Sequence, residues 1–193
     1  LVARLGTAAP AVVTFHAYAL NLVQNYYRAA GYVRPPRTIG VQELRQHLQR
    51  TLLREDARLW PRYRSALASR SLLALLTDLL AGAANNDLCE SQVEEMLIAS
   101  GRPDLVELAG FAARYRGQLK RECLLDAEQA VVEALRLLEH DPDLPGTIRS
   151  GCPHVFVDEF HDATYAQARL ALPVGHGGLF VAGNPARAIN SYR

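Results

Sequence analysis

The chain has 193 residues, of which 49% are hydrophobic and 21% are charged, and its formal net charge is +1 at pH 7. This length suits one ordinary domain or a small domain with a large insertion, and the apolar share is enough to bury a sizeable core. The nearly neutral charge excludes a protein that binds nucleic acid through a uniformly basic surface. Any contact with DNA must therefore use a local groove.

The cysteines, Cys89, Cys123 and Cys152, are odd in number and far apart, and no C-x-x-C pair occurs. We therefore expect neither a disulfide framework nor a zinc ribbon, and a reducing, cytoplasmic setting fits best. No apolar run approaches the roughly 20 residues that span a bilayer, so we expect no membrane contact. The chain opens without an initiator Met or a signal-peptide pattern, which suggests a piece cut from something longer.

The first 34 residues predict a strand followed by a helix. The β-branched run at 11–14 is typical of a buried strand. From Phe15 to about Ala30 apolar residues recur at helical spacing, and Gly31 is expected to end that helix.

The next hundred residues read as helical. Amphipathic patterns predict helices over 41–54, 71–84, 89–100, 104–119 and 126–139. Breaks are expected at Asn85-Asn86-Asp87 and at Gly101, and the Pro-rich and Asp-rich run 140–146 predicts a loop. No convincing strand occurs between about 35 and 150.

Strands return near the end of the chain. Compact apolar runs at 154–157 and 178–182 predict buried strands, with a short helix over 164–172 between them. This order is typical of a parallel sheet. The predicted fold class is therefore α/β, with a parallel sheet (1–34 and 151–193) interrupted by a mostly α-helical inserted subdomain (35–150).

The stretch Val155-Phe156-Val157-Asp158-Glu159 carries the most chemical information. Its two acids follow a strand directly, at the edge where open α/β sheets bind ligands. Phosphoryl transfer needs one carboxylate near Mg²⁺ and a second group that acts on the attacking water. Asp158 can serve the metal through a water ligand, and Glu159 can act on the nucleophilic water. The alternative is that both acids simply end a strand in solvent.

Three segments in order resemble motifs of UvrD/Rep/PcrA-type superfamily 1A DNA helicases. Residues 158–164, DEFHDAT, with Gln167 beyond them, resemble D-E-F-Q-D-[TS]. Residues 183–193, GNPARAINSYR, resemble G-D-P-D-Q-S-I-Y-x-[FW]-R, and TFHAYAL at 14–20 resembles T-F-H-[SA]. The resemblance implies part of a P-loop NTPase (RecA-like) first motor domain, in a protein that uses ATP and Mg²⁺.

The resemblance also implies roles for single residues. Asp158 and Glu159 take the metal and water-activating roles, and Arg187 stands at the position that senses the nucleotide. Residues that would lie along the single-stranded DNA path are Thr14, Phe15, His16, Asn190, Tyr192 and Arg193, with Tyr192 stacking on a base.

Several positions depart from the family pattern. His161 and Arg187 both stand where the family carries Gln, Asn184 replaces a common Asp, and Asn190 replaces an aromatic residue. Arginine is a fixed cation that accepts no hydrogen bond, so it cannot orient a water as an amide does. No G-x-x-x-x-G-K-[ST] phosphate loop occurs, and we expect it before residue 1 in a longer parent. We expect these 193 residues alone to bind nucleotide weakly or not at all.

The leading hypothesis is a fragment of an ATP-dependent 3′-to-5′ helicase or translocase hydrolase. It would serve DNA repair or recombination, acting on single-stranded DNA and its junction with duplex, alone or beside a partner motor or nuclease subunit. The direction and the pathway come from the resemblance. The second hypothesis is a degenerate helicase-like subunit that binds DNA without ATPase activity. A third, an all-helical scaffold, leaves the strand-end motifs unexplained.

Overall fold

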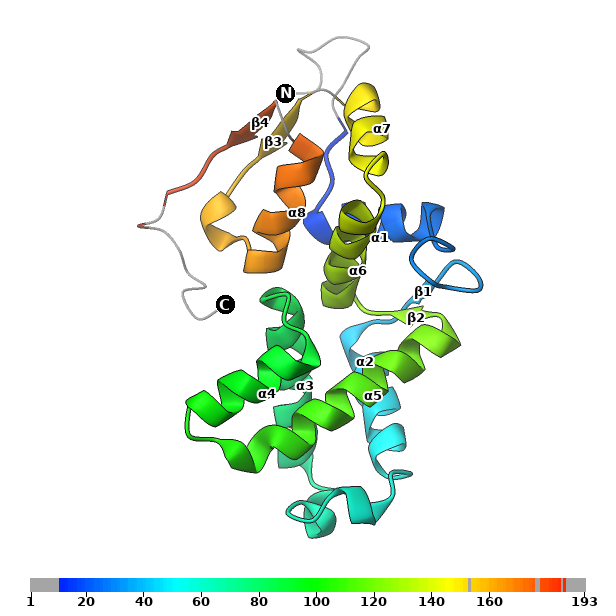
Figure 1. Ribbon diagram of the computed structural model, residues 1–193, viewed down its shortest axis with the longest axis vertical. Helices are drawn as coiled ribbons and strands as arrows, with labels where there is room; N and C mark the ends of the chain where they lie inside the picture. The colour runs from blue at the N-terminus through cyan, green and yellow to red at the C-terminus, as the bar shows by residue number, and fades with distance from the viewer. Residues whose placement is uncertain (1–10, 153, 176–177, 185, 187–193) are drawn as a thin grey trace.

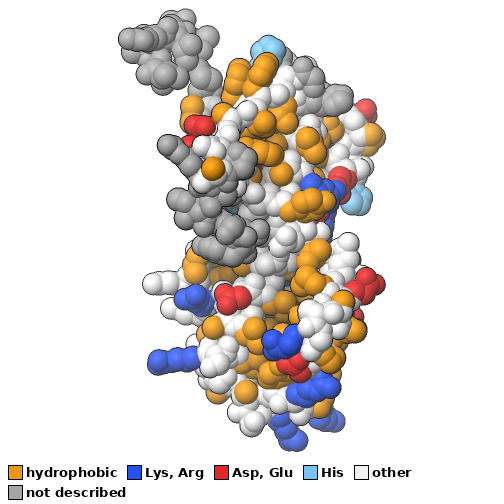
Figure 2. Space-filling view, turned by 90° about the vertical axis from the view of Figure 1, so that its left-hand side faces the viewer, with side chains coloured by type: hydrophobic (Ala, Val, Ile, Leu, Met, Phe, Trp, Pro, Cys, Tyr) orange, Lys and Arg blue, Asp and Glu red, His pale blue; other side chains and the backbone are white. Residues whose placement is uncertain are grey.

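The computed structural model describes residues 11–152, 154–175, 178–184 and 186. The molecule is elongated, with two strands and four helices at one end and a group of four helices at the other (Figure 1). Each end has its own hydrophobic core. Figure 2 shows hydrophobic side chains on both ends of this face, whereas most of the Lys and Arg side chains visible there lie on the helical end.

The first core lies between four helices of the strand-bearing end. Helix α6 is buried around most of its surface, and helix α1 packs along it while α8 covers another side. Eight of its residues are buried, so α6 lies in the centre of this core. The four helices are α1 (Phe15–Asn25), α6 (Ala127–His140), α7 (Leu144–Gly151) and α8 (Tyr165–Gly175).

The predicted strand at 11–14 is wrong. These residues are exposed and extended, Val12 is 86% exposed, and no described strand pairs with them. A β-branched run becomes a strand only where a neighbour completes the ladder of hydrogen bonds. Thr14 instead starts α1, because its hydroxyl oxygen accepts the N–H of Ala17 at 3.1 Å.

Helix α1 is also shorter than the predicted Phe15–Ala30. It ends at Asn25, and two further turns lead to Gly31. Gly31 adopts a left-handed conformation with φ of +80°, and the Tyr32 N–H donates to the Tyr27 carbonyl at 2.8 Å. This is the hydrogen-bond pattern that ends helical turns at glycine, but α1 itself ends at Asn25, so the prediction that Gly31 ends this helix is wrong.

The second core belongs to the helical end and matches the predicted helices closely. Trp60 is fully buried and packs against Phe111, with Tyr115 stacked on the far side of Phe111. Asp87 and Gly101 end the helices before them in left-handed conformations, as predicted. The helices are α2 (Val41–Leu52), α3 (Arg70–Asn85), α4 (Glu90–Ala99) and α5 (Val106–Glu122), with short 3₁₀ turns at Ala57–Leu59, Arg64–Ala66 and Pro103–Leu105.

A short parallel pair of strands marks the place where the chain enters and leaves the helical end. Strand β1 (Arg37–Thr38) pairs with β2 (Leu124–Leu125). The expectation of no strand between 35 and 150 is therefore wrong, although each strand has only two residues. Runs this short carry no detectable alternation in the sequence.

The predicted loop at 140–146 is only half correct. Asp141, Pro142 and Asp143 form a loop, but α7 already begins at Leu144. The Asp141 carboxylate accepts the Leu144 N–H at 3.1 Å, and Pro145 lies in the first turn, where its missing N–H costs nothing. Pro145 suggests a loop in the sequence, but in the structure it lies in the first turn of a helix.

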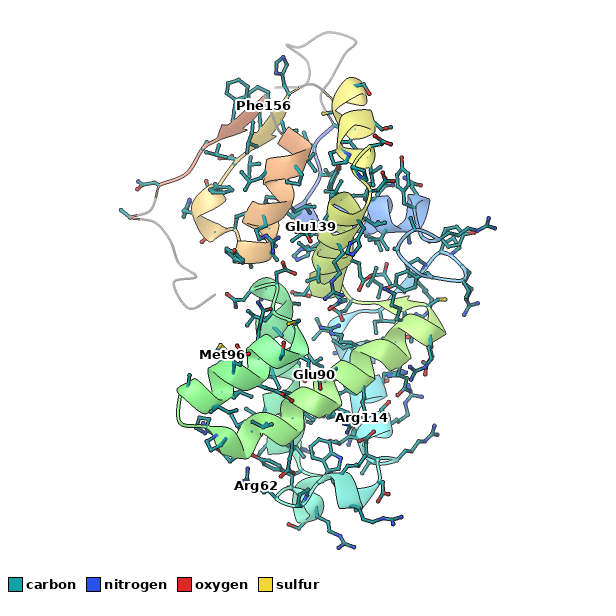
Figure 3. All side chains as sticks on the ribbon, viewed as in Figure 1. Arg62, Glu90, Met96, Arg114, Glu139 and Phe156 are labelled. Atoms are coloured by element: carbon teal, nitrogen blue, oxygen red, sulfur yellow. The ribbon has the colours of Figure 1, made fainter. Side chains whose placement is uncertain are left out.

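The predicted strands near the end of the chain are confirmed as a parallel pair. Strand β3 (Val155–Val157) pairs in register with β4 (Leu179–Val181), and α8 connects them. The prediction that both strands are buried is wrong in the described structure. Phe156 is 75% exposed and stacks on Phe180, with ring centroids 4.8 Å apart (Figure 3).

Candidate functional site

The two acids predicted from the sequence lie at the carboxyl end of β3. Both are exposed, and the Glu159 N–H donates to Asp158 Oδ1 at 2.9 Å. Glu159 adopts a left-handed backbone with φ of 50° and ψ of 38°. A non-glycine residue there costs on the order of 1 kcal/mol, and such conformations concentrate at functional sites.

The loop after β4 lies against this turn. The Ala182 N–H donates to the Val157 carbonyl at 2.8 Å, and the Phe160 N–H donates to the Ala182 carbonyl at 2.9 Å. Gly183 permits the close approach, since a Cβ there would lie 3.1 Å from the His161 backbone nitrogen and 3.2 Å from its Nδ1. The ends of both strands therefore form one continuous surface.

His161 joins the two strand ends through its ring. Its Nε2 lies 3.2 Å from Glu159 Oε2, and its Nδ1 accepts the Asn184 N–H at 3.2 Å. The His161 side chain is only 5% exposed, while that of Glu159 is 68% exposed. The buried His161 ring thus lies against the exposed Glu159 carboxylate.

The start of α8 brings a third segment to this region. Thr164 and Gln167 cap each other, because the Thr164 N–H donates to Gln167 Oε1 at 3.1 Å and the Gln167 N–H donates to Thr164 Oγ1 at 3.3 Å. The amide nitrogen of Gln167 then faces His16 Nε2 at 3.4 Å. Because this nitrogen can only donate, His16 Nε2 is the acceptor.

The structure places the predicted site residues unevenly. Asp158 and Glu159 lie together, and His16 contacts the helix that follows them. Thr14 uses its hydroxyl to cap α1, and Phe15 packs partly buried against the first core. The remaining predicted site residues, Arg187, Asn190, Tyr192 and Arg193, lie outside the described residues.

The sequence did not predict the contacts of His161, Asn184 and Gln167. The T-x-x-Q pattern at 164–167 is a capping-box signature and was available as a signal. His161 was visible only as a departure from a family motif. Its contact to a residue 23 positions later depends on strand pairing, which no local pattern encodes.

The residues at the strand end fit a magnesium ion that keeps most of its waters. Asp158 offers a free carboxylate oxygen to solvent, and Asp162 Oδ1 is buried without a hydrogen-bond partner among the described residues. No group of three or more His, Cys, Asp or Glu side chains within the described ranges could hold a metal ion. Mg²⁺ is commonly bound by one or two carboxylates together with substrate phosphates, so it needs no such group.

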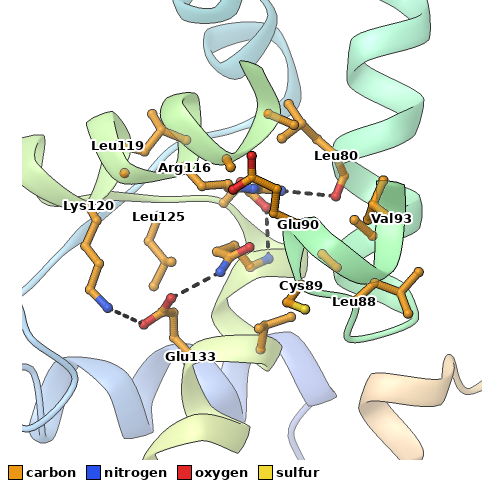
Figure 4. Close-up of a pocket in the computed structure, with 18 of the residues that line it drawn as sticks. Leu80, Leu88, Cys89, Glu90, Val93, Arg116, Leu119, Lys120, Leu125 and Glu133 are labelled. Carbon is orange, nitrogen blue, oxygen red and sulfur yellow. Dashed lines mark hydrogen bonds and ion pairs between the residues drawn. The ribbon is translucent and has the colours of Figure 1, made fainter. Parts of the chain in front are cut away.

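A cavity of about 330 Å³ lies elsewhere, between α3, α4, α5 and α6 (Figure 4). Five of its charged side chains are paired with one another, since Arg116 binds Asp126 while Lys120 and Arg136 bind Glu133, and Glu90 and Cys89 also line it. The chemistry lies at the strand ends.

Within the described ranges, no helix is both long enough and apolar enough to cross a membrane. No curated protein matches the chain significantly. The model of the UvrD/REP helicase N-terminal domain family matches residues 2–193. Because this match covers almost the whole chain and includes the acidic strand end, the chain belongs to the UvrD/REP helicase N-terminal domain family.

Proposed function

We propose that this chain is part of an ATP-driven DNA motor that moves 3′ to 5′ on single-stranded DNA in repair or recombination. The observation that carries the proposal is the pair of acids at the end of β3, held against the loop after β4, in a chain of a helicase family. Family membership supports ATP, Mg²⁺ and DNA as ligands in general. The direction and the pathway rest on the resemblance of the motifs.

Two residues carry the proposed chemistry. Asp158 holds the metal through its free carboxylate oxygen, and a bound Mg²⁺ supplies charge stabilisation to the phosphates. Glu159 accepts a proton from the attacking water, a role that suits an exposed carboxylate that lies 3.2 Å from the His161 ring. The Glu159 backbone N–H donates to Asp158 Oδ1, which keeps both acids in one turn.

The phosphate-binding part of the site is proposed to come from outside these residues. The chain contains no G-x-x-x-x-G-K-[ST] loop, so it offers no backbone cradle or lysine of that type. Arg187 is proposed to contact a phosphate as a fixed cation in place of the usual amide.

The proposed DNA path runs over Thr14, Phe15, His16, Asn190, Tyr192 and Arg193. Of these, His16 is supported by its contact with Gln167, which links the start of α1 to the segment behind the acids. Tyr192 is proposed to stack on a base, an interaction worth about 1–3 kcal/mol.

The helical end is proposed to be an inserted subdomain that lies near the junction of single-stranded and duplex DNA. The boundaries at 35 and 150 stay a prediction. The packing favours a narrower insertion, from β1 to β2, because α6 and α7 belong to the core of the strand-bearing end. The parallel β1–β2 pair brings together the two segments through which the chain enters and leaves the helical end.

A second candidate function is a DNA-binding subunit without ATPase activity, beside a partner motor or nuclease. Two observations favour it: His161 and Arg187 replace two glutamines of the family motifs, and the phosphate loop is not among these residues. Both candidates predict DNA binding, but only the motor predicts ATP turnover.

ATP hydrolysis by the full-length protein that carries these residues separates the two. Turnover is measured with and without single-stranded DNA, while DNA binding is followed by fluorescence anisotropy. Turnover that rises with DNA supports the motor. DNA binding without turnover supports the second candidate and overturns the first.

A further inference from the structure

His161 makes a polar contact at each of its ring nitrogens. Its side chain is 5% exposed and lies between two loops that are 23 residues apart in sequence. One contact reaches the Glu159 carboxylate, and the other reaches the Asn184 backbone N–H. Within the described residues, the Glu159 carboxylate has no other side-chain partner.

The two contacts fix where the ring carries its proton. The Asn184 N–H can only donate, so His161 Nδ1 must be an unprotonated acceptor. The single proton of the neutral imidazole then lies on Nε2, which is 3.2 Å from Glu159 Oε2. A neutral ring in one tautomer satisfies both neighbours.

Steric contacts hold the ring in this place. The Phe160 N–H is bonded to the Ala182 carbonyl, which closes the two loops on each other. A Cβ at Gly183 would meet His161 Nδ1 at 3.2 Å, so a larger residue there would push the loop after β4 and the ring apart by a few tenths of an ångström.

We propose that His161 is a positioning residue that orients Glu159 and couples it to the loop after β4. The inference rests on the proposed motor function, because it assumes that Glu159 acts on the attacking water. An exposed glutamate samples many rotamers, and the polar contact with a buried ring 3.2 Å away favours a few of them. The same ring makes the position of Glu159 depend on residues 183 and 184, so a shift in one loop displaces the other.

Side-chain chemistry supplies matched variants. Glutamine carries both an N–H donor and a carbonyl acceptor, so His161→Gln can bond Glu159 and Asn184 together. Leucine fills similar space but can do neither. Gly183→Ala pushes the loop and the ring apart but keeps both ring nitrogens, and it provides a second test if the His161→Leu protein fails to fold.

The test is steady-state ATP hydrolysis by the full-length protein with saturating single-stranded DNA. His161→Leu is expected to lower kcat about 10–100-fold and to leave the KM for ATP within about threefold, as expected for a misplaced catalytic group. Gly183→Ala is expected to lower kcat in the same direction but less. His161→Gln is expected to keep kcat within about threefold of wild type.

A second readout needs no turnover. Nitrogen NMR of the histidine rings is expected to show His161 protonated at Nε2, and the Asn184 amide resonance is expected to shift in His161→Leu. A ring protonated at Nδ1 overturns the proposal. So does an active wild type whose His161→Leu variant is equally active, or whose His161→Gln variant is as impaired as His161→Leu. A wild type without DNA-stimulated turnover overturns the proposed function itself, and with it the catalytic role of His161.

Discussion

Asp126 is the residue whose loss should weaken the fold most per atom removed. Its carboxylate caps α6, accepting the Gln129 N–H at 3.0 Å, and it also pairs with Arg116 of α5. The Arg116 side chain is 18% exposed and that of Asp126 is 6% exposed. Since α5 belongs to the second core and α6 to the first, this one carboxylate ties the two ends of the molecule together.

The expected cost of Asp126→Ala follows from these two roles. Breaking a buried ion pair from one side costs about 3–5 kcal/mol, because the remaining charge stays buried and unpaired. Losing a helix cap costs about 1 kcal/mol. The two effects overlap because they come from one carboxylate, and the Arg116 side chain is still partly exposed to solvent. We therefore expect Asp126→Ala to lower the free energy of unfolding by about 4 kcal/mol in total. With a urea dependence of about 2.5 kcal/mol per molar, the unfolding midpoint falls by about 1.5 M.

Urea unfolding of the 193-residue chain measures this. Trp60, the single tryptophan, reports on the second core by fluorescence, and far-ultraviolet circular dichroism reports on all helices. The matched control is Ser69→Ala, which removes only the cap of α3, where the Ser69 oxygen accepts the Leu72 N–H at 3.1 Å. That control should cost about 1 kcal/mol. An Asp126→Ala protein no less stable than Ser69→Ala would refute the reasoning, whereas replacing Asp126 and Arg116 together by apolar residues should restore most of the loss.

Two further predictions concern glycine and tyrosine. Gly101 has a φ of +73°, so Gly101→Ala should lower the free energy of unfolding by about 1 kcal/mol. Gly82 lies inside α3 with open space at its Cβ position, so Gly82→Ala should raise it by about 0.5–1 kcal/mol. Urea unfolding measures both, and changes of the same sign would contradict the backbone assignment. Burial, followed by the negative charge of Glu133, raises the pKa of Tyr32, and burial raises that of Tyr115. Both folded-state pKa values lie above the unfolded value of about 10. The stability that these two phenols contribute is therefore fully present below about pH 10 and is lost as the pH rises further. Tyr32→Phe should lessen the loss between about pH 10 and 12 in urea titrations, and an unchanged slope would argue against the burial of this phenol.

The helices were predictable because their signals are local. Leucine spacing and the expected helix breaks predicted the ends of α2, α3 and α4 to within one or two residues. The parallel strands β3 and β4 were predictable as apolar runs, and the acids after β3 as their endings. Each of these features depends on fewer than about 20 neighbouring residues.

The errors share a different cause. Residues 11–14 have a strand composition but no described strand beside them, and the paired residues of β1 and β2 are 87 positions apart in sequence. The link from His161 to Asn184 likewise depends on the register of β3 and β4. Long-range pairing decides such features, and a single sequence does not reveal the partner.

The most direct test of the central claim combines nucleotide binding with hydrolysis in a Glu159→Gln variant of the full-length protein. Glu95→Gln, an exposed glutamate of α4 far from the strand ends, is the matched control. The account predicts that Glu159→Gln binds ATP with Mg²⁺ and single-stranded DNA as wild type does, while turnover falls at least about 100-fold, the scale of a lost general base. Turnover that is unchanged in Glu159→Gln, or that falls equally in Glu95→Gln, would contradict the assignment of the acidic strand end as the catalytic site.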